Sequence, residues 1–126
     1  MANYELPDGS QCQFSSYERQ FLPEQLFVPS SSESASNFPG IPHMILESIS
    51  KSDIDIRREL FLNIILSGGT AMLKGFQERT SKVLPDISPQ NAKVKVLGGN
   101  DRRFQPWMGG SILSSLGSFQ QMWMSR

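Results

Sequence analysis

The chain has few of the residues that would form a disulfide, a thiolate metal cluster or a membrane span. Cys12 is the only cysteine among the 126 residues, so an intrachain disulfide and a zinc site built from several thiolates are both excluded, and a reducing compartment is favoured. No apolar stretch approaches the roughly 18 residues of a membrane span. The start, MANYELPDGS, lacks both the basic and the apolar region of a signal peptide. We therefore expect a soluble intracellular protein that makes no membrane contact.

An excess of charge of one sign is also missing. Twelve acidic and twelve basic side chains cancel, so no net field draws the chain to nucleic acid. Arg102-Arg103 is too short a basic run to form a nucleic-acid surface, and we expect no direct sequence-specific contact of that kind. The apolar fraction of 38% is compatible with a core, and the length suits one small domain or a piece of a larger one.

Turn-forming residues divide the N-terminal part of the chain. The segment YELPDG at 4–9 contains the Pro-Asp-Gly signature of a turn, and QCQF at 11–14 alternates as a strand does. Pro23 is predicted to open a short helical turn. The segment PSSSESASN at 29–37 is low in complexity and has almost no apolar residues, which predicts a flexible surface loop.

The middle of the chain predicts helices around one buried strand. Pro42 suits the first turn of a helix whose apolar residues repeat at helical spacing, namely Met44, Ile45 and Ile49. SDID at 52–55 resembles a capping box with Asp55 in place of Glu or Gln, and predicts the start of a second short helix. The apolar run at 63–67 predicts a buried strand.

A second helix and strand follow, and this alternation predicts an α/β fold. The helix is expected at 75–84, where Pro85 would end it, with one face formed by Phe76, Thr80, Val83 and Leu84. The alternating segment KVKV at 93–96 predicts a strand exposed on one side. Pro106 then opens a helix containing Gly109-Gly110, which predicts close approach of another backbone. Gly117 is expected to end that helix, and Ser118 to cap a last one with an apolar edge of Phe119, Met122 and Trp123.

The segment LSGGTAML at 66–73 is the best candidate for a ligand site. Its glycines allow a ligand to approach the backbone and its free N–H groups. It is not a P-loop, because Lys74 precedes Gly75 and no Ser or Thr follows in register, and it lacks the three glycines of a dinucleotide fingerprint. From these residues alone, an ordinary turn with glycines for geometry is favoured over a phosphate cradle.

Other candidate sites are weaker. Ser67 is not part of a G-x-S-x-G motif and the only histidine, His43, lies in a different element, which argues against a Ser-His-acid hydrolase. Three acids on one helix could suggest a metal site, but acids in a first helical turn more often complement the helix dipole; they are Asp53, Asp55 and Glu59. Arg103 could cover an anion or stack on a base.

Five collinear segments resemble the C-terminal part of actin and the actin-related proteins. They are YELPDG at 4–9, ERQFLPEQLFVPS at 18–30, DIDIR at 53–57, LSGGTAML at 66–73 and WMGGSILSSLGSFQQMWMSR at 107–126. The resemblance implies the C-terminal portion of the actin-like (ribonuclease H-like) ATPase fold, incomplete in this chain. It implies an end of the small outer subdomain with the serine-rich loop at 1–36, a nucleotide-side α/β subdomain at 37–104 and C-terminal helices at 105–126.

Within the family, some details are most similar to the nuclear actin-related protein four type. These are Arg102-Arg103-Phe104 before Trp107, Leu116-Gly117-Ser118-Phe119 before Gln120, and Cys12 with Phe14. That type implies a scaffold in nuclear chromatin-remodelling or histone acetyltransferase complexes, with actin and other complex subunits as partners. Its location would be nuclear, with the cytoplasm as a second location. A conventional filament-forming actin is the first alternative, and an interaction module without nucleotide binding is the second.

The resemblance also implies one side of an ATP site. Gly68, Gly69 and Thr70 would form the backbone cradle, while Met72 and Leu73 would lie on the base side. Arg103 stands where actin has a lysine near the adenine, and Leu73 where actin has an aromatic residue.

The final helices would pack on sequence that this chain does not contain, so their apolar faces are expected to promote self-association.

We predict that this chain by itself does not hydrolyse ATP. The resemblance places the two phosphate hairpins, the metal-positioning acid and the catalytic-water residues in sequence that is not present here, so ATP with Mg²⁺ is expected only in the intact protein. One side of a phosphate site cannot orient a water molecule for hydrolysis. A phosphate-release assay on the purified chain should stay at the buffer rate, and saturable magnesium-dependent turnover would contradict the prediction.

Overall fold

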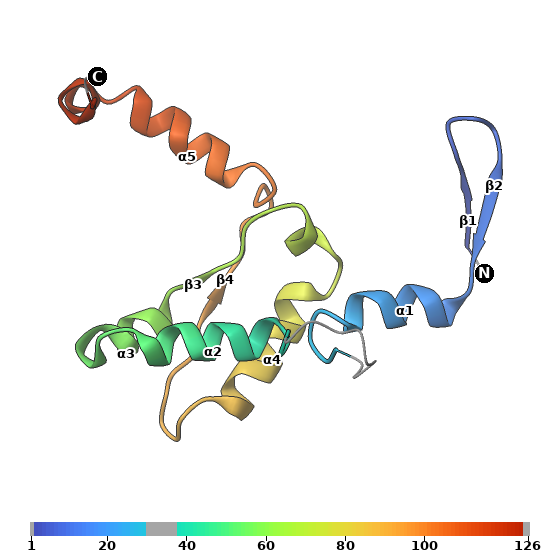
Figure 1. The fold of residues 1–126 in the computed structure, drawn as a ribbon, viewed down its shortest axis with the longest axis horizontal. Helices are drawn as coiled ribbons and strands as arrows, with labels where there is room; N and C mark the ends of the chain where they lie inside the picture. Colours follow the sequence, from blue (N-terminus) through green and yellow to red (C-terminus); the bar gives the residue numbers. More distant parts are fainter. Residues whose placement is uncertain (1, 30–37, 125–126) are drawn as a thin grey trace. The chain divides into compact units, whose positions relative to one another are not determined.

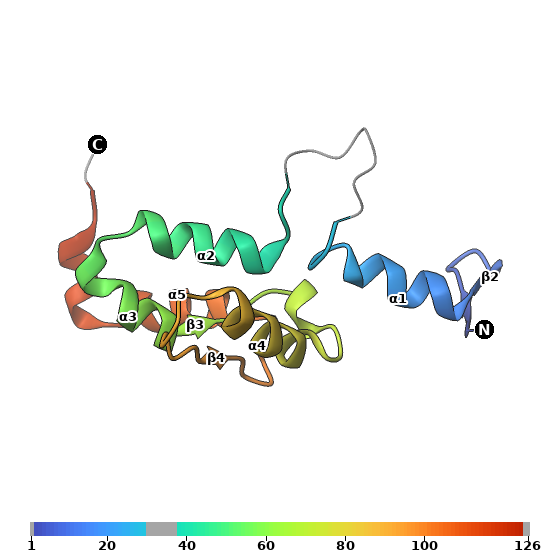
Figure 2. The same cartoon turned by 90° about the horizontal axis from the view of Figure 1, so that it is seen from below.

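The computed structural model describes residues 2–29 and 38–124 (Figures 1 and 2). The chain forms two compact units, Met1–Ser48 and Ile49–Arg126. Apart from Pro29, the predicted loop at 29–37 lies outside the described residues. In the part of the chain that is described, no helix is both long and apolar enough to cross a membrane.

The first unit begins with a β-hairpin, as predicted. Strands β1 (Ala2–Glu5) and β2 (Gln11–Phe14) pair antiparallel. Gly9 has φ +82° and donates its N–H to the carbonyl of Leu6 at 2.9 Å, which closes the turn. The Asp8 carboxylate accepts hydrogen bonds from the Ser10 hydroxyl at 2.6 Å and the Ser10 N–H at 2.9 Å, and these bonds lower the pKa of Asp8.

Helix α1 (Ser16–Glu24) starts earlier than predicted. The prediction that Pro23 opens a helical turn is wrong, since Pro23 lies near the C-terminal end of this helix. The start is determined by a capping box: Ser15 N–H donates to Glu18 Oε2 at 2.7 Å, and Glu18 N–H donates to Ser15 Oγ at 3.2 Å. The bonds from the Ser15 backbone and hydroxyl lower the pKa of Glu18. The two ends of a first helical turn thus satisfy each other before Pro23 is reached.

Helices α2 (Ile41–Lys51) and α3 (Ile54–Leu62) both occur where the sequence predicts them. Pro42 is the second residue of α2, and Ile49 on the predicted apolar face is buried, although Met44 is exposed. The N-cap of α3 is Asp53, whose carboxylate accepts a hydrogen bond from the Asp55 N–H at 3.3 Å. The predicted box starting at Ser52 is therefore wrong by one residue, because the aspartate is the better-placed capping oxygen.

The second unit contains two short parallel strands, and together with its helices they confirm the α/β class. Strand β3 (Ile64–Ile65) pairs with β4 (Val96–Leu97). β3 is shorter than the predicted strand at 63–67, and the predicted strand at 93–96 is largely wrong, since β4 overlaps it only at Val96. Asn63 serves as the C-cap of α3 instead, donating its N–H to Leu60 O at 3.2 Å and its side chain to Glu59 O at 2.9 Å. Ile65 is 66% exposed, so the prediction of a fully buried strand is wrong on that face.

Helix α4 (Phe76–Ile87) packs against β4 and continues past the predicted stop. Three residues of the predicted face are buried, namely Phe76, Thr80 and Leu84, while Val83 is only half-buried. The Thr80 hydroxyl donates to the Phe76 carbonyl at 2.7 Å. Pro85 lies inside the helix rather than after it. The proline removes a single N–H, and its helical acceptor would be Ser81, which is exposed, so water can replace that bond.

Helix α5 (Gln105–Ser114) and the 3-10 helix η2 (Gly117–Met122) bury none of their residues. Pro106 lies in the first turn of α5, as predicted. The expected close backbone at Gly109-Gly110 is not found in the described chain, because a Cβ at either glycine would meet open space. Gly117 does not end α5, which stops at Ser114, and Ser118 lies inside η2, whose N-cap is Leu116. At the end of α5, the hydroxyls of Ser114 and Ser115 both donate to the Ser111 carbonyl, at 2.9 and 2.8 Å, so these serines satisfy the helix end before Gly117 is reached.

We predict that the exposed apolar residues of α5 drive self-association of this chain. Trp107 is 74% exposed and Ile112 63% exposed, and covering such surface is worth about 25 cal/mol per Å². Analytical ultracentrifugation should show a sedimentation coefficient that rises with concentration, and Trp107→Ser with Ile112→Ser should remove this rise.

The matched control is Tyr4→Ser with Val28→Ser, which removes two apolar residues that are each 60% exposed but lie outside α5 and η2. This control pair should associate as the unchanged chain does. A monomer at every concentration of the unchanged chain would contradict the prediction.

Candidate functional site

The candidate site is the glycine turn, residues 67–70, at the end of β3. Leu66 is buried and donates its N–H to the Leu97 carbonyl at 2.8 Å, which aligns the chain before the turn. Gly68 has φ +96°, a conformation that strongly favours glycine. Gly69 has φ −63° and ψ −42°, and is the N-cap of the 3-10 helix η1 (Thr70–Met72). The strand therefore turns sharply at Gly68 and enters a short helical segment.

Arg102, in the loop after β4, holds the glycine turn in place. This role was not predicted from the sequence. The Arg102 carbonyl accepts the Gly68 N–H at 2.9 Å, and its Nε donates to the Ala71 carbonyl at 2.7 Å. A further bond from Nη1 reaches Gly99 O at 3.4 Å. Arg102 thus connects the loop after β4 to Gly68 within the glycine turn and to Ala71 directly after it. In the sequence, Arg102 is seen only as part of a short basic pair. Its contact with Ala71 cannot be read from local patterns, because the two residues are 31 positions apart.

The remaining predicted site residues lie on the same two segments. Met72 is the last residue of η1 and Leu73 is its C-cap, and they are 42% and 40% exposed. Arg103 follows Arg102 and is exposed, with its guanidinium carbon 5.4 Å from the centroid of the Phe104 ring. The hydrogen bonds of Arg102 therefore bring the loop that contains Arg103 to the glycine turn. Arg103 itself makes a cation–π contact within its own loop.

The turn presents unpaired backbone donors. Among the described residues, the N–H groups of Gly69 and Thr70 have no hydrogen-bond acceptor, and both residues are exposed. Successive N–H groups after a glycine with positive φ form a concave nest that suits an anion. The arrangement therefore fits a phosphate group, whose oxygens accept such bonds.

The weaker candidates do not come together into a site. His43 is an exposed residue in the first turn of α2, and Ser67 is exposed at the start of the glycine turn. Asp53 is the N-cap of α3 and Asp55 lies in its first turn, where acids are expected to complement the helix dipole, while Glu59 lies further along the helix. Within residues 2–29 and 38–124, no group of three or more His, Cys, Asp or Glu side chains could hold a metal ion.

Comparisons with known proteins agree on one family. The family model described as Actin matches residues 1–126. Actin-related protein 4 of Arabidopsis thaliana is 47% identical over 137 residues, which cover 98% of this chain and 31% of that protein. Actin-related protein 4 of Oryza sativa subsp. indica and that of subsp. japonica are each 43% identical over 136 residues, covering 98% of this chain and 30% of each relative. The chain thus spans less than a third of the length of these curated relatives.

We predict that the two glycines of the turn differ in their effect on stability. Gly68→Ala should lower the free energy of unfolding by about 1–2 kcal/mol, because a Cβ is disfavoured at positive φ. Gly69→Ala should leave it unchanged or raise it by up to about 1 kcal/mol, because the backbone is already helical and the space is open. Urea unfolding followed by circular dichroism measures both, and equal losses would show that Gly69 is also required by the turn.

Proposed function

We propose a function from the premise that the chain belongs to the actin family. The intact protein is an ATP-binding scaffold subunit of nuclear chromatin-remodelling or histone acetyltransferase complexes, and this chain supplies one side of its ATP site. Actin-related proteins match 98% of this chain, which supports an actin-related protein as its source.

Gly69 is the observation that supports nucleotide binding most directly. Its helical backbone does not need a glycine, and no described atom beyond Gly69 and its two chain neighbours lies within 4 Å of the position where a Cβ would be. Alanine would be more stable in such a conformation by roughly 0.5–1 kcal/mol. A glycine with no internal reason for its presence is explained if a ligand approaches the backbone there. The adjacent unpaired N–H groups indicate that this ligand is an anion.

The residues around the turn suggest how ATP would be held. The N–H groups of Gly69 and Thr70 would donate to phosphate oxygens, while Gly68 holds the turn in shape through Arg102. The half-exposed side chains of Met72 and Leu73 would offer apolar surface to the base, and the Arg103 guanidinium would provide a nearby cation. ATP, when bound, would bring the negative charge that these donors neutralise. The residues of this chain bind and orient the nucleotide, and we propose that they do not carry out its hydrolysis.

The scaffold role rests on the resemblance to the actin-related protein four type. Relatives with that name are 43–47% identical to nearly the whole chain. We propose actin and other subunits of a chromatin-modifying complex as partners, and a nuclear location with the cytoplasm as second. Helices α5 and η2, which bury none of their residues, offer apolar surface for association with other protein. A conventional filament-forming actin remains the alternative within the family.

An interaction module without nucleotide binding is the second candidate function, and two observations favour it. Leu73 is aliphatic, so it cannot stack on a base as an aromatic ring does. The Arg103 guanidinium already lies over the ring of Phe104, 5.4 Å from its centroid. Both features weaken the base side of the site while leaving the glycine turn intact.

Isothermal titration calorimetry of the intact protein with ATP tests the proposal. The Gly69→Ala variant should bind about tenfold more weakly or worse, which corresponds to about 1.4 kcal/mol, because the methyl group occupies the path of the phosphates. Gly110→Ala is the matched control, since Gly110 is also helical and surrounded by open space. Equal affinities of the two variants would contradict the placement of the phosphates, and absence of ATP binding by the unchanged protein would favour the interaction module.

A further inference from the structure

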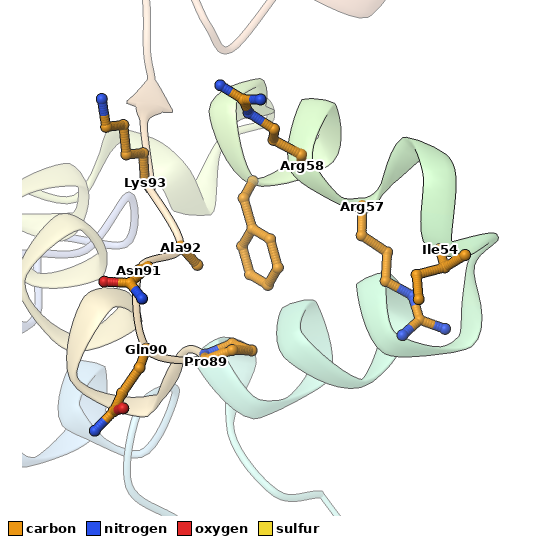
Figure 3. Close-up of a pocket in the computed structure, with 9 residues that line it drawn as sticks. Ile54, Arg57, Arg58, Pro89, Gln90, Asn91, Ala92 and Lys93 are labelled. Atoms are coloured by element: carbon orange, nitrogen blue, oxygen red, sulfur yellow. The ribbon is translucent and has the colours of Figure 1, made fainter.

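A pocket of about 380 Å³ lies in the second unit, away from the glycine turn along the sequence (Figure 3). One side is formed by α3 and the other by the turn between α4 and β4. Its lining residues are Ile54, Arg57, Arg58, Phe61, Pro89, Gln90, Asn91, Ala92 and Lys93. The pocket is large enough for a bulky apolar side chain.

The turn that forms one side of the pocket has a defined shape. The Ala92 N–H donates to the Pro89 carbonyl at 3.0 Å, and Asn91 has φ +75°, a conformation that Asn tolerates better than most residues. The Lys95 N–H then donates to the Phe61 carbonyl at 2.9 Å, which connects this side to the end of α3. Both sides of the pocket are therefore held together by backbone hydrogen bonds.

The interior of the pocket is mainly apolar. Phe61 is 6% exposed and belongs to the core, while Ile54 at the other end is 73% exposed. Ala92 and Pro89 add small apolar surfaces opposite α3. Exposure of an apolar side chain to water is unfavourable, so a partner side chain that covered Ile54 would gain binding free energy.

All charged residues that line the pocket are cations. Arg57, Arg58 and Lys93 form no ion pair with any carboxylate in the described part of the chain. This holds although Asp53 lies one helical turn before Arg57, and Asp55 three residues before Arg58, where such pairs often form. The Arg57 Nε instead donates to the Ser52 carbonyl at 3.0 Å, which holds its side chain in place.

The cations lie at two places around the apolar interior. In Figure 3, the head groups of Arg58 and Lys93 extend to the same side, one from α3 and one from the opposite segment. Arg57 lies at the other end, beside Ile54. A ligand that satisfies this pattern needs an apolar group between two negative groups. Because the chain has no net charge, a general attraction for polyanions does not account for the pattern.

We propose that this pocket docks an acidic peptide segment of a partner protein. One apolar side chain of the peptide enters the pocket between Ile54 and Ala92, and carboxylates on either side of it pair with Arg58 and Lys93 and with Arg57. The apolar interior favours a peptide over a nucleic acid, whose phosphates would use the cations and leave the interior uncovered. This docking site is separate from the ATP site and does not depend on nucleotide binding.

Fluorescence anisotropy tests the proposal, using the intact protein and a short labelled peptide with a central Leu-Phe pair flanked on both sides by two Asp residues. Arg58→Glu with Lys93→Glu should weaken binding at least about tenfold, because attraction becomes repulsion at two positions. Ala92→Leu, which fills the pocket without changing charge, should weaken it to a similar extent. Rising sodium chloride should reduce the affinity.

Three controls decide between explanations. Lys74→Glu with Lys82→Glu makes the same charge change at two exposed positions outside the pocket and should bind as the unchanged protein does. A peptide with Asn in place of Asp, and one with Ser in place of Leu-Phe, should each bind more weakly. ATP binding should be the same in the pocket variants, so this proposal and the proposed nucleotide site fail separately.

The proposal is overturned if the pocket variants bind the peptide as well as the Lys74 and Lys82 control does. It is also overturned if the unchanged protein does not bind the peptide at millimolar concentration, or if a single-stranded oligonucleotide competes more strongly than the peptide. Circular dichroism of each variant confirms that a loss of binding is not a loss of folding.

Discussion

A ladder of backbone hydrogen bonds between two distant segments organises the second unit. It runs from Lys95 N–H to Phe61 O, through the paired strands β3 and β4, to Gly68 N–H and Arg102 O. The strands themselves contain only two residues each, so the bonds beyond their ends contribute much of the pairing. Parallel pairing requires a long connection between strands, and α4 provides it, with Phe76, Thr80 and Leu84 buried as part of the core.

The two candidate sites lie at opposite ends of this ladder. The glycine turn and Arg102 follow the carboxyl ends of β3 and β4, which is where α/β proteins commonly bind ligands. The cationic pocket lies at the other end, where Phe61 and Lys93 precede the strands. One pairing register therefore determines which side chains meet in both places. A shift of register would separate Arg102 from Gly68 and Lys93 from Arg58.

The burial of apolar residues differs between parts of the chain, and the exposed ones are available for contact with other protein. The core of the second unit is small, whereas α5 and η2 bury no residue at all. Helices of this kind are stable in proteins mainly through the packing of one face. The glycines of α5 fit the same view, because the open space around them in the described chain leaves room for another backbone to approach.

Local features were determined by the sequence itself. The turn at Gly9, the buried face of α4, the start of α5 near Pro106 and the glycine turn after β3 all depend on residues within a few positions of one another. Where two local signals competed, the prediction failed: Ser15 and Glu18 cap α1 well before Pro23, and α4 runs through Pro85 because one lost N–H does not outweigh the burial of Leu84.

Only the tertiary structure decided which distant residues meet. The short strands, the exposed face of Ile65 and the bond from Arg102 to Ala71 across 31 residues have no local signal. The same is true of the cationic pocket, since Arg58 and Lys93 belong to separate elements that pairing brings together. The physical reason is that turn chemistry and helical periodicity act between near neighbours, whereas a strand register is set by the packing of the whole unit.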